Sequence, residues 1–317
     1  MKKLITLLLA LALFAAMAAV PALAEDNLYV AMFPKAYIGD FWKSVEAGAQ
    51  QAAKDFGVTI TFEGPESETD LEGQIMLIEN AIIKGADVIA IAPLDSVGNV
   101  PVIETADEKG IKVITFNSKL ESDIPQTHVA TDNWAAGEMA GKALGEVLEG
   151  KGKFAIIGAN EAVKNNRDRS DGAAAYIAEH FPEMELITIQ YTDGDMTKAL
   201  SAGGDIITAN PDIAGFFTNN ETTTIALATV LQEKGLAGKI KHVGFDATLQ
   251  TVGYLEDGTT NAIVTQVPFN MGYIAVEKAI AAYKGEALEP IYDTGVALVT
   301  LENLNTPEIQ SIVNPQG

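Results

Sequence analysis

The chain has 317 residues, and its 43 acidic and 21 basic side chains give a formal net charge of −22. Binding to nucleic acid or anionic lipid requires a basic surface, so we expect neither as a partner. Because the chain has no cysteine, disulfides, thiol catalysis, thiolate metal sites and a lipid-modified cysteine anchor are excluded.

The first 24 residues have the pattern of a signal peptide. Lys2 and Lys3 precede an uncharged apolar stretch over residues 4–20, and Ala22-Leu23-Ala24 is a small-residue cleavage site. We therefore expect residues 1–24 to be removed on export, which leaves a periplasmic protein without a lipid anchor. An uncleaved membrane anchor is the alternative, since an apolar stretch of this length can barely span a bilayer.

Strand-like and helix-like segments alternate through the rest of the chain. Nearly continuous apolar, β-branched runs predict strands at residues 28–33, 58–62, 88–92, 112–116, 153–157, 186–190, 213–217, 241–245 and 262–266. Helical patterns between them predict helices over residues 41–56, 71–83, 134–148, 171–180, 222–234 and 268–283. This alternation indicates an α/β fold of parallel sheets built from strand–helix–strand units.

This number of strands is larger than one doubly wound sheet usually contains, so we expect two lobes. No Ser- or Pro-rich linker separates them, and residues 128–133, 266–268 and 294–297 are the segments expected to cross between them. The predicted N-terminal lobe comprises residues 25–130 plus 267–294. The predicted C-terminal lobe comprises residues 131–266 plus 295–317.

Several of the predicted strands end on a polar residue that can form hydrogen bonds. Asn117, Asn220, Asp246 and Gln266 each follow an apolar run. In open α/β sheets, ligands bind just outside the carboxyl ends of the strands, so these side chains predict a polar pocket. The alternatives are helix capping by Asn117, Asn220 or Asp246, and a purely structural role for Gln266 at its crossing.

The motifs of common catalytic sites are absent from the sequence. There is no phosphate-binding P-loop, no dinucleotide-binding glycine motif and no nucleophile elbow. The histidines at 128, 180 and 242 lack metal-ligand spacing, so we interpret each as a surface or packing residue. We therefore expect a protein that is not an enzyme and binds neither a metal nor a cofactor.

Aromatic and guanidinium groups complete the candidate pocket. Sugars and polyols need planar hydrogen-bonding groups for their hydroxyls and flat apolar surface for their C–H faces. Phe41 and Trp42 follow the first strand and supply such a surface, although both can equally belong to the core. Arg167, preferred here to Arg169, can bond two hydroxyls and balance Asp246, although it can instead pair with Asp171 one helical turn on.

A family resemblance is carried by segments spread over residues 27–300. The strongest are residues 41–50, Gly85-Ala86-Asp87 with residues 92–96, residues 110–114, Thr131-Asp132-Asn133 and Val243-Gly244-Phe245-Asp246. In these segments the chain resembles periplasmic solute-binding proteins of the ribose-binding type, the receptors of sugar ABC importers. The resemblance implies two Rossmann-like lobes joined by a three-stranded hinge, with ligand held in the cleft.

The resemblance also implies which residues contact the ligand. Positions matching Phe41, Trp42, Arg167, Asn220, Asp246 and Gln266 contact the sugar in ribose-type receptors, and this sequence keeps compatible residue types at all of them. It departs from the family at Asn117-Ser118, where ribose receptors carry an Asp-Arg pair, and at Gly194, near which they carry an aromatic residue. These changes argue for a ligand other than ribose.

The first loop is longer than in ribose receptors. Its Pro34-Lys35 is similar to autoinducer-2 and rhamnose receptors, in which the matching lysine contacts the ligand, and Gly64-Pro65 resembles the same subgroup. Lys35 is therefore a candidate contact. The alternative for Lys35 is a solvated loop lysine.

From these observations we expect a monomeric, non-catalytic receptor for a monosaccharide or related polyol that docks on the membrane subunits of an ABC importer. A signalling receptor presenting autoinducer-2 or a sugar to a membrane sensor is the alternative. A sugar-responsive transcription factor needs a helix-turn-helix and a basic surface, neither of which is present. An exported enzyme on the same scaffold is the remaining hypothesis.

Overall fold

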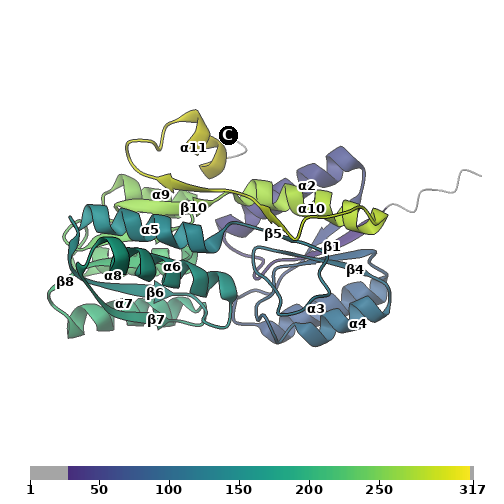
Figure 1. Ribbon diagram of the computed structural model, residues 1–317, viewed down its shortest axis with the longest axis horizontal. Coiled ribbons are helices and arrows are strands. Elements are labelled where there is room, and N and C mark those ends of the chain that lie inside the picture. The colour runs from purple at the N-terminus through teal and green to yellow at the C-terminus, as the bar shows by residue number, and fades with distance from the viewer. Residues whose placement is uncertain (1–27, 315–317) are drawn as a thin grey trace, which may run out of the picture.

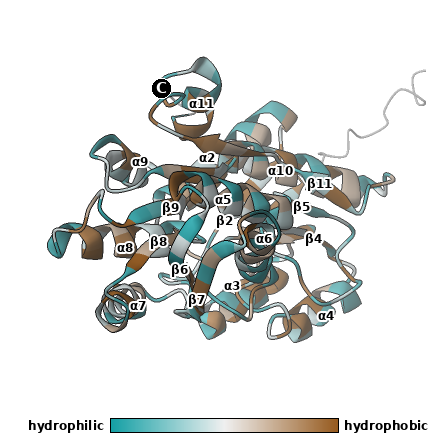
Figure 2. Ribbon diagram, turned by 60° about the vertical axis from the view of Figure 1, so that its left-hand side comes forward, coloured by the Kyte–Doolittle hydropathy of each residue, from teal (hydrophilic) through white to brown (hydrophobic). Residues whose placement is uncertain are grey.

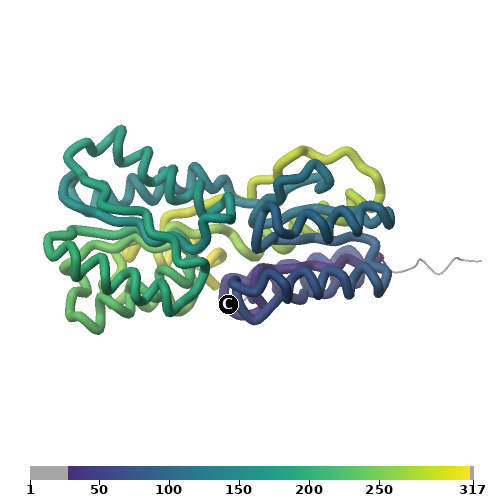
Figure 3. Tube along the Cα trace, turned by 90° about the horizontal axis from the view of Figure 1, so that it is seen from below, coloured from purple at the N-terminus to yellow at the C-terminus, as the bar shows by residue number. Residues whose placement is uncertain are grey.

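The computed structural model describes residues 28–314 and has two lobes, each built on a six-stranded sheet (Figure 1). Seen from below, the N-terminal part of the chain forms one lobe and the teal and green middle part forms the other (Figure 3). The C-terminal segment, in yellow, reaches both lobes. The predicted α/β architecture of two lobes is thus confirmed.

The N-terminal lobe carries a sheet with the strand order β11-β5-β4-β3-β1-β2, in which all pairs are parallel. Its elements are β1 (Tyr29–Phe33), α2 (Asp40–Phe56), β2 (Thr59–Phe62), α3 (Leu71–Lys84), β3 (Val88–Ile91), α4 (Val100–Glu108), β4 (Lys112–Phe116), β5 (His128–Ala130), α10 (Pro268–Lys284) and β11 (Ile291–Asp293).

The C-terminal lobe carries a sheet with the order β12-β10-β9-β8-β6-β7, in which only the edge strand β12 is antiparallel to its neighbour. Its elements are α5 (Asn133–Val147), β6 (Lys151–Gly158), α6 (Lys164–His180), β7 (Glu183–Tyr191), α7 (Met196–Ala209), β8 (Ile213–Thr218), α8 (Glu221–Glu233), β9 (Lys241–Phe245), α9 (Leu249–Glu256), β10 (Ala262–Gln266), β12 (Val296–Val299) and α11 (Pro307–Val313).

The chain passes between the lobes at the three segments expected from the sequence. It leaves β5 for α5, leaves β10 for α10, and leaves β11 for β12. These short connections form the hinge. The exact lobe boundaries at residues 130/131, 266/267 and 294/295 stay a prediction.

Burial of the strands on both faces explains their continuous apolar sequences. In β1, Val30 and Met32 point into the cluster formed with α2 and α10, whereas Ala31 and Phe33 point into the cluster formed with α3 and α4. Successive side chains of a strand point to opposite faces, so a strand covered by two layers needs apolar residues throughout. The helices that cover the sheets change between teal and brown along each turn, as amphipathic helices do (Figure 2).

The structure differs from the expected helices in several places. Helix α6 begins at Lys164, seven residues before the expected start at 171. The sequence hides this start because Asn165 and Asn166 are weak helix formers, whose burial in the folded chain outweighs their low propensity. Helices α4, α7, α9 and α11 have no counterpart among the expected ranges. Helix α7 contains Gly203-Gly204 in its interior, a pair that lowers the helical signal.

Close helix pairs hold the covering layer of each lobe. A Cβ added to Gly272 of α10 would overlap the carbonyl oxygen of Val45 in α2, and one added to Gly48 of α2 would overlap the carbonyl oxygen of Phe269. In the other lobe, Gly137 of α5 meets the α6 backbone at the Arg169 carbonyl in the same way. The backbones therefore approach closely only because these residues lack side chains.

The expected signal peptide, residues 1–24, lies outside the described residues. Within residues 28–314, no helix has the length and apolar character needed to cross a membrane.

We expect Gly272→Ala to lower the free energy of unfolding by about 3 kcal/mol or more, because the new methyl group overlaps the α2 backbone. Gly253→Ala in α9 is the matched control, since no atom lies within 4 Å of its added Cβ. This control should raise stability by roughly 1 kcal/mol through helix propensity. Urea unfolding of both variants checks the prediction, and equal stabilities would contradict it.

Candidate functional site

A cavity of about 410 Å³ lies between the lobes, within the range of about 300–1,000 Å³ typical of ligand pockets. Strand ends from both sheets point into it: Asn117 follows β4, Asn220 and Asp246 follow β8 and β9, and Gln266 ends β10. The predicted site residues that line it are Lys35, Phe41, Trp42, Asn117, Asn220, Asp246 and Gln266.

Asn117 and Asp246 occupy equivalent places in the two lobes. β4 and β9 hold the same position in their sheets, and the residue that follows each has a left-handed backbone, with φ of 59° at Asn117 and 66° at Asp246. Among residues with a Cβ, Asn and Asp adopt this conformation most readily. The turn directs each short polar side chain into the cavity instead of continuing the strand.

Asp246 is the buried anion of the site, with 5% of its surface exposed. Its Oδ1 accepts a hydrogen bond from Gln266 Nε2 at 2.9 Å, and its Oδ2 accepts one from the backbone N–H of Glu221 at 3.1 Å. Burial raises the pKa of its carboxyl, while the positive charge of Arg169 and the bond from Gln266 oppose that rise. A carboxylate here therefore depends on these partners.

Arg169 is the buried cation that balances the charge of Asp246. Its Nε donates to Asn133 Oδ1 at 2.8 Å, and its Nη1 donates to the Asn219 carbonyl oxygen at 2.9 Å. The guanidinium lies 4.0 Å from the centre of the Phe245 ring. Burial lowers the pKa of Arg169 to about 10, so the group remains charged at neutral pH. The close approach of α5 and α6 at Gly137 brings Arg169 within reach of Asn133.

The expectation that Arg167 contacts the ligand ahead of Arg169 is corrected by the structure. Arg167 lies outside the cavity lining, and its guanidinium bonds the Glu161 carbonyl oxygen on another face of the lobe. The reason is helix phase, since Asn165 and Arg169 are four residues apart and share one face of α6. Arg167, two residues from each, points the other way.

The aromatic residues form the opposite wall, in the N-terminal lobe. Trp42 packs edge-on against Phe41 and Phe116, with ring centres 5.0 Å and 6.3 Å apart. Phe41 and Trp42 belong to the core packed against α2 and also border the cavity, so the core interpretation is confirmed and ligand contact stays a prediction. The indole N–H of Trp42 donates to Glu68 Oε1 at 3.1 Å and so brings a carboxylate to the cavity edge.

Direct hydrogen bonds join the lobes beside the cavity. Lys35 Nζ donates to Asn165 Oδ1 at 3.4 Å, and Asn165 Nδ2 donates to Asn117 Oδ1 at 3.3 Å. On the outer side, Ser96 Oγ donates to the Ala162 carbonyl oxygen at 3.2 Å. Lys35 is buried, which lowers its pKa to about 8 although Glu68 opposes the shift. The solvated-loop interpretation of Lys35 is therefore wrong.

Asn220 has the capping role that the sequence left open. Its Oδ1 accepts from the Thr223 backbone N–H at 2.9 Å as the N-cap of α8, and Thr223 Oγ1 completes a capping box. The side chain nevertheless borders the cavity. The cap occupies the oxygen, which leaves Nδ2 as the atom that can serve a ligand.

Two buried polar atoms of the cavity wall have no hydrogen-bond partner among the described residues. They are Nη2 of Arg169, a donor, and Oε1 of Gln266, an acceptor. Both atoms are fully buried, so neither is reached from the cavity in this arrangement of the side chains. Buried polar groups without partners are costly, so both atoms lower the stability of this wall.

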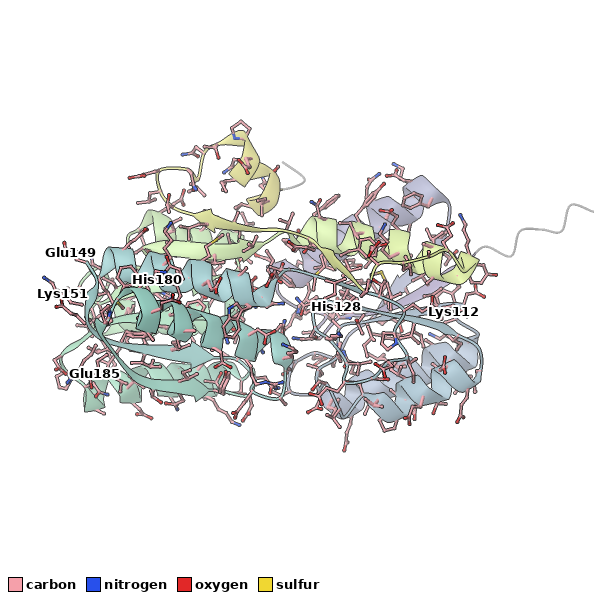
Figure 4. All side chains as sticks on the ribbon, viewed as in Figure 1. Lys112, His128, Glu149, Lys151, His180 and Glu185 are labelled. Carbon is pink, nitrogen blue, oxygen red and sulfur yellow. The ribbon has the colours of Figure 1, made fainter. Side chains whose placement is uncertain are left out.

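The histidines take no part in the cavity. His128 and His180 lie in different lobes (Figure 4), and His242 is buried with both ring nitrogens bonded to Thr218 and Thr260. Burial lowers the pKa of His242 to about 3. Among residues 28–314, no cluster of three or more His, Asp or Glu side chains has the geometry to hold a metal ion.

The sequence did not single out several cavity residues, namely Glu68, Asn165, Asn166 and Glu221, and it placed Arg169 behind Arg167. Asn165 and Arg169 had a readable signal, since their spacing places both on one helix face once α6 starts at Lys164. Glu68 lies in the loop between β2 and α3, where no periodicity applies.

Comparison with known proteins gives matches over nearly the whole chain. Residues 30–287 match the family described as periplasmic binding protein domain. The ribose import binding protein RbsB of Salmonella typhimurium is 30% identical over 308 residues, which is 94% of this chain and 98% of that protein.

Solved structures agree with this match. A carbohydrate transporter solute binding protein from Agrobacterium radiobacter in complex with D-arabinose has a TM-score of 0.87 at 30% identity, covering 92% of this chain and 100% of that one. An ABC transporter solute binding protein from Agrobacterium vitis with bound D-fucose has a TM-score of 0.85 at 32% identity, covering 90% and 99%.

We expect Arg169→Met to lower the free energy of unfolding by about 3–5 kcal/mol, because it leaves the Asp246 carboxylate buried without its counter-charge. Arg167→Met, the matched control on the same helix, should change it by less than about 0.5 kcal/mol. Adding Asp246→Asn to Arg169→Met should restore part of the loss, since the unpaired charge is then gone. Denaturant unfolding measures all of these, and equal losses at the two arginines would contradict the pairing.

Proposed function

The chain belongs to the periplasmic binding protein family, and from that membership we propose that it is the substrate-binding component of an ABC importer for a monosaccharide or related polyol. The family consists of binding proteins of transporters. We therefore propose a role in capture and delivery without catalysis.

The observation that carries this proposal is the lining of the cavity, which combines hydrogen-bonding side chains with aromatic surface. Arg169 donates hydrogen bonds, Asp246 accepts them, and the amides of Asn220 and Gln266 can do both. A hydroxyl group also donates and accepts, so neighbouring hydroxyls on one molecule suit this set of partners. Phe41 and Trp42 offer apolar surface for the C–H face of such a molecule.

The charges of the cavity argue against an anionic ligand. Lys35 and Arg169 border the cavity together with more numerous carboxylates, namely Asp40, Glu66, Glu68, Asp195, Glu221 and Asp246. These carboxylates would repel a bound anion. Sugars and polyols carry no charge.

The names of similar proteins suggest the size of the ligand. Relatives are named for ribose and allose, and similar structures contain D-arabinose and D-fucose. We propose a pentose or hexose of this kind. Asn117-Ser118 lie at the cavity end of β4, where Asn117 is engaged by Asn165, which supports a hydroxyl pattern different from that of ribose.

We further propose that ligand binding closes the two lobes about the hinge, since the cavity walls come from both. The ligand shifts the equilibrium only through its greater affinity for the closed form. The closed receptor would then dock, as a monomer in the periplasm, on the membrane subunits of the importer.

Calorimetry against a panel of pentoses, hexoses and polyols tests the proposal, with D-ribose, D-allose, D-arabinose and D-fucose included. We expect saturable heat with at least one sugar and a stoichiometry of one. Folded protein that releases no heat with any member of the panel would overturn the proposed function.

For the sugar that binds, we expect Asp246→Asn to weaken binding by about 2–3 kcal/mol, because a hydroxyl loses a charged, buried acceptor. Asparagine tolerates the left-handed backbone at this position, so the loop keeps its conformation. Asp212→Asn, which changes the same charge at an exposed position, is the control and should leave affinity unchanged. Similar affinities for the two variants would contradict a role for Asp246.

A further inference from the structure

Glu221 reaches across the cleft from one lobe to the other. It is the first residue of α8 in the C-terminal lobe, and its Oε2 lies 3.1 Å from the place of a Cβ on Gly39 in the N-terminal lobe. Its carboxylate therefore lies beside the first turn of α2, next to Gly39 and close to the backbone of Phe41.

Helix α2 lacks a cap from its own lobe. Its N-cap residue is Gly39, which has no side chain and adopts a φ of 98°. The first N–H groups of a helix need an acceptor from outside the helix, and a negative charge near them is favourable. The Glu221 carboxylate lies at this terminus from across the cleft, so the contact exists only while the lobes are together.

The same position exposes Glu221 to other charges. Asp40 on α2 and Asp246 after β9 repel its carboxylate. Lys43 on α2 is the cation that faces it, and Lys43 is already paired with Asp40 at 3.0 Å. Burial and the two aspartates raise the pKa of Glu221 to about 7, and the nearby hydroxyl of Thr248 and N–H of Phe41 oppose the rise.

We propose that Glu221 is a positioning residue that couples closure of the lobes to uptake of a proton. The inference rests on the proposed function in that closure is taken to accompany ligand binding. When the lobes separate, Glu221 leaves the α2 terminus and Asp40 and returns to solvent. A protonated Glu221 no longer repels Asp40 across the cleft and loses less hydration on burial.

The direction of the pH dependence follows from the two states. In the closed state the pKa of Glu221 is about 7. Opening removes Asp40 and part of the burial but leaves Asp246, which lies in the same lobe, so the pKa falls toward the ordinary value of 4.5. The proton therefore stabilises the closed state fully below pH 4.5, and this stabilisation is lost as the pH rises through 7. Lys35, with a pKa of about 8, stays mostly protonated across most of this interval.

The test measures lobe separation without a ligand, so that it does not depend on finding the sugar. The chain has no cysteine, so Ile83→Cys in α3 and Asp205→Cys in α7 provide two exposed labelling sites, one in each lobe. Single-molecule energy transfer between dyes at these sites reports the fraction of closed molecules. We expect the closed-to-open ratio to rise about tenfold or more between pH 8 and pH 5.

Glu221→Gln, in the same labelled protein, should hold the high closed fraction at both pH values, since the amide is neutral and has nearly the same shape as the carboxyl group. Glu233→Gln in the last turn of α8 is the control and should keep the response of the parent protein. A parent protein without pH response, or a Glu221→Gln variant that retains more than half of it, would overturn the inference.

The two hypotheses fail separately. If no sugar binds but Glu221 governs a pH-dependent closure, the proposed function fails and the coupling stands. If a sugar binds with a pH dependence that Glu221→Gln does not reduce, the receptor function stands and the coupling fails.

Discussion

The burial of one carboxylate, that of Asp246, is the constraint around which the cleft is organised. A desolvated charge must be paired and hydrogen-bonded, and its partners come from separate elements: Gln266 from the end of β10, Arg169 from α6 and the backbone of Glu221 from α8. Gln266 is also the last residue before the chain crosses to α10. The ionic centre of the site is therefore bonded directly to the hinge, and a ligand that rearranges the hydrogen bonds of Asp246 acts on the segment about which the lobes turn.

The lobes are held together by two kinds of contact. Lys35, Asn165 and Asn117 form a chain of hydrogen bonds that needs no proton exchange at neutral pH, whereas Glu221 meets α2 among other carboxylates. The hydrogen-bond chain fixes how the two lobes are positioned in the closed form. The contact of Glu221 makes the free energy of the closed form depend on pH. Such an interface between the lobes is only weakly stable, as is required of a receptor that must open to release its ligand.

The sequence predicted the strands and their polar ends because buried parallel strands leave continuous apolar runs and their carboxyl ends converge. It did not predict which arginine faces the cleft. That choice depends on the phase of α6, and the weak helix formers at Asn165 and Asn166 hide where the helix begins. Three-residue strands such as β5 and β11 carry too few side chains to show a period. Glu221 was missed because its role depends on contacts with the other lobe, which the sequence around it does not reveal.

Both sheets have the same order of equivalent strands, and each lobe contributes a left-handed residue after its equivalent strand, Asn117 in one and Asp246 in the other. The backbone at these positions admits mainly asparagine, aspartate and glycine. Only about three residue types are therefore compatible with the backbone at these two equivalent positions of the cleft. Exchanging an amide for a carboxylate at either position changes which hydroxyls are recognised, while the main chain keeps its conformation. Related receptors can therefore change their sugar specificity by a single substitution in one lobe, without altering the other.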